Sequence, residues 1–166
     1  HTPAGYSIAA DGRFIAEDWW AIIFNPSFPY RLVHMTLAAL LGTATLVAGI
    51  SAWQLLKRAD NPRARLGFSM ALWLLVVLMP VQIVVGDLHG QHSLKVQPQK
   101  VAAIEGSWTR PAEGAGEPLR LFAWPDMAQR HNHWEVAIPR VASLYLTHDL
   151  SGTIAALDEF PAQDIP

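Results

Sequence analysis

Two long stretches without a charged side chain constrain this chain more than any other feature. Residues 32–56 and 66–85 contain no Asp, Glu, Lys or Arg. Each stretch is long enough to cross a hydrocarbon core of about 30 Å, because a helix rises about 1.5 Å per residue. Buried helices of a soluble domain are the alternative, but such helices usually keep a polar stripe, and residues 72–79 are apolar all round. The sequence therefore predicts two transmembrane helices.

Basic residues predict how these helices are oriented. Four of them, Lys57, Arg58, Arg63 and Arg65, crowd the link between the two stretches. Basic residues favour the cytoplasmic side of a membrane, so the link is expected there and both flanks outside. The expected order is an extracytoplasmic segment (1–25), a transmembrane helix (26–57), a cytoplasmic connector (58–65), a transmembrane helix (66–86) and an extracytoplasmic segment (87–166).

The expected fold class is all-α, a fragment of a membrane helix bundle with a long extracytoplasmic loop that contains short helices. Asn25 followed by Pro26 predicts that the first helix begins near Pro26. Residues 87–166 mix Pro, Gly and charge, which predicts short helices and loops rather than a sheet. Within them, Pro98 and Gly106 are expected to open and close a short helix.

Charge and cysteine content exclude several classes of function. The formal net charge is -2, which leaves no basic surplus for binding nucleic acid. The chain has no cysteine, so it cannot form a disulfide, a thiolate zinc site or an iron–sulfur cluster. Any metal must be held by histidine, methionine, carboxylate or a cofactor.

His34 is the most informative single residue, because it lies just inside the first apolar stretch. Ionisable groups at such positions are rare and usually face the interior of a bundle. Steps of three or four residues from His34 lead along a row of small side chains, namely Ala38, Gly42, Thr45, Gly49 and Ala52. Such a row permits close approach by a helix, or by a flat macrocycle whose iron the imidazole ligates. Spacing alone leaves open a histidine that only bonds a neighbouring helix.

Other polar residues are less specific. Lys100 and Glu105 would lie about 140° apart on their short helix, so they are not an ordinary ion pair, and two unrelated solvated charges are the alternative. The pairs His89 and His92, and His131 and His133, are expected to be loop histidines rather than metal ligands. Three tryptophans near the ends of the spans are expected at the membrane interface, namely Trp19, Trp20 and Trp53.

Four runs of residues carry a family resemblance. They are Asn25–His34 (NPSFPYRLVH), Gly49–Trp53 (GISAW), Gly86–Asp87 and Gln97–Trp108 (QPQKVAAIEGSW). Together they resemble subunit I of the cytochrome bd quinol oxidases, most closely the cyanide-insensitive type. The last run is similar to the start of the quinol-binding loop after the sixth helix of that subunit. The resemblance implies an internal fragment with the fifth and sixth helices and most of this loop.

The resemblance also implies roles for four residues. His34 matches an axial ligand of the low-spin haem b, and thus the haem iron. Lys100 and Glu105 match a pair implicated in binding and oxidising quinol. Asp87 matches an acidic residue at the head of the loop, where it would contribute to the substrate site. Further haems b and d would belong to the complete subunit, with ligands outside this chain.

The implied activity is that of a respiratory terminal oxidase, which oxidises membrane quinol and reduces oxygen to water. The implied partners are oxidase subunit II, the remaining helices of subunit I and the lipid of the bacterial cytoplasmic (inner) membrane. We expect the fragment alone to be inactive, because it lacks the oxygen site. Two alternatives stay open: a non-catalytic membrane helix module, and a haem electron-transfer subunit without oxygen chemistry.

Overall fold

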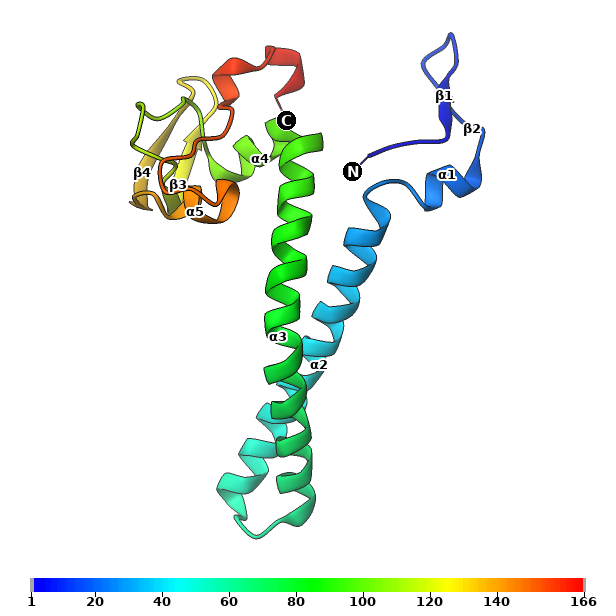
Figure 1. Cartoon of the computed structure of the whole chain (residues 1–166), viewed down its shortest axis with the longest axis vertical. Helices are drawn as coiled ribbons and strands as arrows, with labels where there is room; N and C mark the ends of the chain where they lie inside the picture. The colour runs from blue at the N-terminus through cyan, green and yellow to red at the C-terminus, as the bar shows by residue number, and fades with distance from the viewer. Residues whose placement is uncertain (1, 166) are drawn as a thin grey trace. The chain divides into compact units, whose positions relative to one another are not determined.

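Two long helices, α2 (Phe28–Lys57) and α3 (Pro62–Val96), contain the two uncharged stretches and run antiparallel from a short turn (Figure 1). The computed structural model describes residues 2–165, which divide into two units, 2–89 and 90–165. Both helices are long and apolar enough to cross a membrane. Only 11% and 6% of the residues in their most apolar windows are buried within this chain. Within this chain they are therefore mostly unburied, unlike the core helix of a soluble protein, and their length and composition agree with the prediction.

Helix α2 begins two residues later than Asn25 and Pro26 predict. The Oδ1 atom of Asn25 accepts the N–H of Ser27 at 3.1 Å, and its carbonyl accepts the N–H of Phe28 at 2.8 Å. Asn25 therefore closes a turn before the helix instead of capping the helix itself. Ser27 occupies the cap position, but its hydroxyl bonds the Thr2 hydroxyl at 2.6 Å and does not cap the helix.

Helix α3 begins earlier than predicted, because Asn61 caps it. The Oδ1 atom of Asn61 accepts the N–H groups of Arg63 at 3.1 Å and Ala64 at 3.3 Å. The non-helical connector is therefore only 58–61, where the charge pattern predicts 58–65. Charged residues are good helix formers, so they mark where an apolar span stops without marking where a helix stops.

Helix α3 also continues ten residues beyond the predicted span 66–86, to Val96. His89 and His92 are therefore helical, and the prediction that they lie in a loop is wrong. Pro80 lies inside the helix and does not end it. Gln97 alone separates α3 from the next helix.

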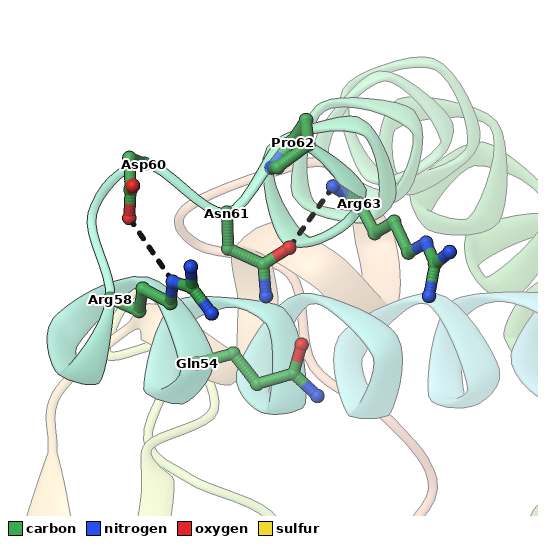
Figure 2. Close-up of a pocket in the computed structure, with 6 residues that line it drawn as sticks. All are labelled: Gln54, Arg58, Asp60, Asn61, Pro62 and Arg63. Carbon is green, nitrogen blue, oxygen red and sulfur yellow. Dashed lines mark hydrogen bonds and ion pairs between the residues drawn. The ribbon is translucent and has the colours of Figure 1, made fainter.

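The turn between α2 and α3 keeps its positive charges at the surface. Figure 2 shows a shallow pocket there, lined by Gln54, Arg58, Asp60, Asn61, Pro62 and Arg63. The Nε atom of Arg58 lies 3.4 Å from the Asp60 carboxylate, and both side chains are exposed. An exposed ion pair of this kind contributes little to stability.

Small residues of α2 face α3, but they are not the row that begins at His34. The buried residues of α2 are Ala44, Ala48 and Ser51, which lie three and four positions apart. A Cβ atom on Gly67 of α3 would lie 2.9 Å from the Ser51 hydroxyl oxygen, so the two helices approach closely there. By contrast, a Cβ atom on Gly42 or Gly49 would meet nothing within 4 Å. The predicted row of small residues is open along this chain.

A small hairpin and a short helix precede α2. Strands β1 (Tyr6–Ile8) and β2 (Phe14–Ala16) pair antiparallel, with Ser7 opposite Ile15. Helix α1 (Trp19–Ile23) is capped by Asp18, whose Oδ1 atom accepts two backbone N–H groups.

The second unit contains a sheet, so the all-α prediction is wrong for residues 87–166. Its elements are α4 (Pro98–Glu105), β3 (Leu119–Asp126), β4 (His131–Ile138), α5 (Val141–Thr147), η1 (Leu157–Glu159) and η2 (Ala162–Asp164). Strands β3 and β4 pair antiparallel as a hairpin, seen in yellow in Figure 1. Asp126 stabilises the turn by accepting the N–H groups of Ala128 and Gln129.

Two small apolar clusters hold this unit together. One contains Val101 of α4, Ala142 and Leu146 of α5, and Ile154. The other contains Ala102 of α4 with Trp108 and Leu157. Helix α4 contributes one residue to each cluster, so it is anchored on two sides.

Candidate functional site

Helix α4 has the bounds that Pro98 and Gly106 predict. Pro98 lies in its first turn, where the missing N–H costs no helical hydrogen bond. Gly106 ends it in the left-handed conformation, with φ 65°. The N–H of Ser107 then bonds back to the carbonyl of Ala102 at 2.9 Å. This closure gives the helix a defined end at Glu105.

Lys100 lies on the exposed side of α4. Among residues 2–165 its ammonium group has no carboxylate within ion-pair distance. Its four-carbon side chain therefore presents a full positive charge with three donors and no partner in the described chain. Val101, the next residue, is buried and fixes the backbone that carries it.

Glu105 is held at both its side chain and its backbone. The Tyr145 hydroxyl donates to the Glu105 carboxylate oxygen Oε2 at 2.6 Å. An Arg120 guanidinium nitrogen donates to the Glu105 carbonyl at 3.0 Å. Burial, followed by the hydrogen bond to Glu105, raises the pKa of Tyr145, so its hydroxyl stays protonated and remains a donor.

Arg120 joins three elements of the second unit. Besides the end of α4, it contacts the Glu135 carboxylate of β4 at 3.1 Å and the Glu117 carboxylate at 3.7 Å. The Arg120 side chain is only 13% exposed. A guanidinium group suits this position, because it is planar and donates in several directions at once.

Glu117 is the one carboxylate of this network that is fully buried, at 1% exposure. The Ser107 hydroxyl lies 3.2 and 3.3 Å from its two carboxylate oxygens. Burial raises the pKa of Glu117 above its ordinary value, while the Arg120 charge acts in the opposite direction. The backbone N–H of Glu117 bonds to the buried hydroxyl of Ser143 on α5. Glu117 thus joins α5, the hairpin and the segment after α4.

The hairpin also holds the residues that follow α4. Asn132 of β4 donates to the Gly106 carbonyl at 2.9 Å and accepts from the Trp108 indole N–H at 2.8 Å. A Cβ atom on Gly106 would lie 3.3 Å from this amide, so only glycine leaves room for it without a shift. The β3–β4 hairpin, which the sequence does not predict, therefore braces the end of α4, which the sequence does predict.

We expect Glu117→Ala to loosen this brace. Removing this buried carboxylate costs about 3 kcal/mol, because the Ser107 hydroxyl loses its hydrogen bond and Arg120 loses a buried opposite charge. Backbone amides of residues 98–108 should then exchange with solvent roughly 100-fold faster. Hydrogen–deuterium exchange of the full-length complex measures this effect. Glu113→Ala, at an exposed acidic residue of the same segment, is the matched control, and equal exchange in both variants would contradict the assignment.

His34 lies in the first unit, half-buried between α2 and α3. The Gln82 side-chain nitrogen lies 3.3 Å from each ring nitrogen of His34. A Cβ atom on Gly86 would lie 3.3 Å from the imidazole, so α3 approaches the ring at a glycine. The His89 ring is edge-on at 5.6 Å between centroids. The buried Oε1 atom of Gln82 has no hydrogen-bond partner among the described residues.

Asp87 follows Gly86 in α3, one residue after the glycine that packs on His34. It is half-buried. The prediction that it lies at the head of a loop is wrong in structure, because the helix continues past it. Its part in binding substrate stays a prediction.

The second histidine pair lies on strand β4. His131 and His133 are 3.2 Å apart between ring nitrogens, and His133 lies 3.2 Å from the Asp126 carboxylate. Residues 2–165 contain no group of three His, Cys, Asp or Glu side chains that could hold a metal ion. These contacts stabilise the hairpin end.

Sequence reasoning missed Tyr145, Arg120, Glu117 and Asn132. Tyr145, Arg120 and Asn132 contact the end of α4 from 15 to 40 residues further along the chain. Glu117 bonds Ser107, which is ten residues away. Glu117 lies among glycines and a proline, in a stretch that predicts a solvated loop. The β3–β4 hairpin carries Arg120 and Asn132 to α4, and the packing of α5 on α4 carries Tyr145 there.

Comparisons with known proteins agree on one family. A family model for cytochrome bd terminal oxidase subunit I matches residues 1–166. The chain is 30% identical over 147 residues to cytochrome bd-II ubiquinol oxidase subunit 1 of Escherichia coli, covering 87% of this chain and 28% of that protein. It is 29% identical over 166 residues to cytochrome bd ubiquinol oxidase subunit 1 of Bacillus subtilis, covering 97% and 34%.

A solved structure has the same fold. The bd oxidase from Geobacillus thermodenitrificans matches with a TM-score of 0.77 at 24% identity, covering 97% of this chain and 36% of that one. The chain thus spans about a third of the length of the relatives it matches.

Proposed function

The chain belongs to the cytochrome bd terminal oxidase subunit I family, and on that basis we propose that it forms the quinol-oxidising part of a respiratory oxidase. The complete enzyme would oxidise membrane quinol and reduce oxygen to water. The observation that carries the proposal is α4, a short helix with defined ends that presents Lys100 and Glu105 and is braced by the hairpin and α5. Such rigidity suits a site that must orient a substrate.

Lys100 and Glu105 have complementary roles in this proposal. The Lys100 ammonium group would donate hydrogen bonds to a quinol hydroxyl oxygen and orient the ring. Glu105 would accept the proton that a quinol hydroxyl releases as electrons leave the ring. Tyr145 occupies Oε2 of Glu105, while Oε1 makes no hydrogen bond to residues 2–165 and is available for that proton. Asp87 would contribute a further polar contact to the bound quinol.

His34 fits the role of an axial ligand to a low-spin haem b. The Gln82 amide nitrogen lies beside its ring, and the buried Oε1 atom of the same amide has no partner among the described residues. A Cβ atom on Gly42 or Gly49 of α2 would meet nothing within 4 Å, which is compatible with a flat group lying along that face. Gly86 lets α3 pack directly on the ring, which fixes its orientation. A haem held there would supply one-electron redox chemistry. The chain's own contribution would be an imidazole nitrogen held in position between α2 and α3.

We also propose the partners and the location that the family implies. The two apolar helices would lie in the bacterial cytoplasmic membrane beside the remaining helices of the subunit and oxidase subunit II. The basic connector would face the cytoplasm, and α4 with the hairpin would lie outside. Protons released from quinol would then leave on the outer side.

Adding quinol to the anaerobic full-length complex should reduce its haem and, on admission of oxygen, start oxygen consumption. A reduced-minus-oxidised spectrum and an oxygen electrode measure the two steps. Haem reduction without oxygen consumption would favour the electron-transfer subunit instead. If the complex contained no haem, the remaining interpretation would be a non-catalytic membrane helix module.

A further inference from the structure

We propose that Tyr145 is a positioning residue for Glu105, a role that rests on the quinol-oxidising function proposed above. Its hydroxyl oxygen lies 2.6 Å from Oε2 of Glu105, which is the length of a strong bond to a charged acceptor. The two residues are 40 positions apart in sequence. The contact therefore depends on how α5 is placed against α4, and not on local chain geometry.

Helix α5 is placed firmly enough for this role. Ala142 and Leu146 share one apolar cluster with Val101 of α4, so the same packing fixes both helices. Their neighbour Ser143 is fully buried and bonds to the carbonyl of Gly152 at 2.7 Å. At the other end of α5, the Gln91 amide donates to the Leu146 carbonyl at 2.8 Å. Tyr145 projects from this fixed backbone toward Glu105.

The hydrogen bond defines which carboxylate oxygen is available. A glutamate side chain rotates about three bonds, and an exposed one samples many orientations. The Tyr145 hydroxyl holds Oε2 and leaves Oε1 as the acceptor for the substrate proton. The other charged groups nearby leave this arrangement intact: Arg120 contacts the Glu105 carbonyl, and its charge is balanced by Glu117 and Glu135.

Tyr145→Phe in the full-length complex tests the proposal. Phenylalanine keeps the ring and removes only the hydroxyl. We expect kcat for quinol oxidation to fall about tenfold with KM little changed, because the lost contact orients the proton acceptor in the transition state. The haem spectrum should stay as in the parent enzyme. Thr147→Val is the matched control, since it also removes one hydroxyl from α5. The Thr147 hydroxyl bonds only backbone carbonyls, so this variant should keep the parent kcat.

A double variant separates positioning from a general structural effect. If Tyr145 acts through Glu105, then Tyr145→Phe should cause no further loss in a Glu105→Gln background. Losses that multiply would overturn the proposal, and so would a single Tyr145→Phe variant with the parent kcat. A Glu105→Gln enzyme with undiminished quinol oxidation would instead overturn the proposed function itself. The two failures are thus distinguishable in one set of enzymes.

Discussion

Glu105→Ala should lower quinol oxidation by the full-length enzyme about 100-fold to 10,000-fold, which is the range that a positioned proton acceptor contributes. Alanine removes the carboxylate but keeps α4, because the helix is anchored by Val101 and Ala102 and ends at Gly106. The haem spectrum should therefore be unchanged. Steady-state oxygen consumption with a soluble quinol measures the loss.

Glu113→Ala is the control for this variant, since it removes an exposed carboxylate from the same segment without touching α4. Its quinol oxidation should equal that of the parent enzyme. If Glu105→Ala instead lost haem and activity in equal proportion, Glu105 would be a structural residue, and the assignment of a proton acceptor would be wrong.

His34→Ala should abolish the low-spin haem b signal in the reduced-minus-oxidised spectrum of the complete complex. An alanine side chain offers no donor to iron, and an axial ligand to a haem cannot be replaced by packing. Quinol oxidation should be lost with the signal, because the electrons from quinol would have no acceptor near α2.

His89→Ala is the matched control for His34→Ala. The two imidazole rings lie 5.6 Å apart between centroids. If His34→Ala only weakened the low-spin haem signal, that spectrum alone would not show which of the two is the ligand. We expect His89→Ala to retain the low-spin signal. The opposite result, with the signal kept in His34→Ala and lost in His89→Ala, would reassign the ligand.

The sequence predicts most reliably those features that depend on residues close together in the sequence. The presence of two long apolar helices follows from the absence of charge, and the bounds of α4 follow from Pro98 and Gly106. The ends of α2 and α3 depend instead on single side-chain hydrogen bonds. Asn25 and Asn61 both accept backbone N–H groups, yet one closes a turn and the other caps a helix. That choice is decided by the surrounding fold.

The β3–β4 hairpin shows why residues 87–166 were harder to predict. Pro125 lies within β3 and Pro118 just before it, and proline cannot donate to a strand ladder. Pairing between strands supplies the missing stabilisation, since the two eight-residue strands pair from Leu119 with Ile138 to Asp126 with His131. The contacts of Arg120 depend on that pairing, and the contact of Tyr145 depends on the packing of α5 against α4, so no local pattern reveals the network.

The junction at Gln97 limits how this segment can change in length. Inserting one residue near the end of α3 would turn α4 by about 100° and advance it by about 1.5 Å. Such an insertion would carry Lys100 away from its present orientation and pull Val101 out of its cluster. The tip of the hairpin, at residues 127–130, is exposed. We therefore expect an added residue to disturb the site less at that tip than at the junction between α3 and α4.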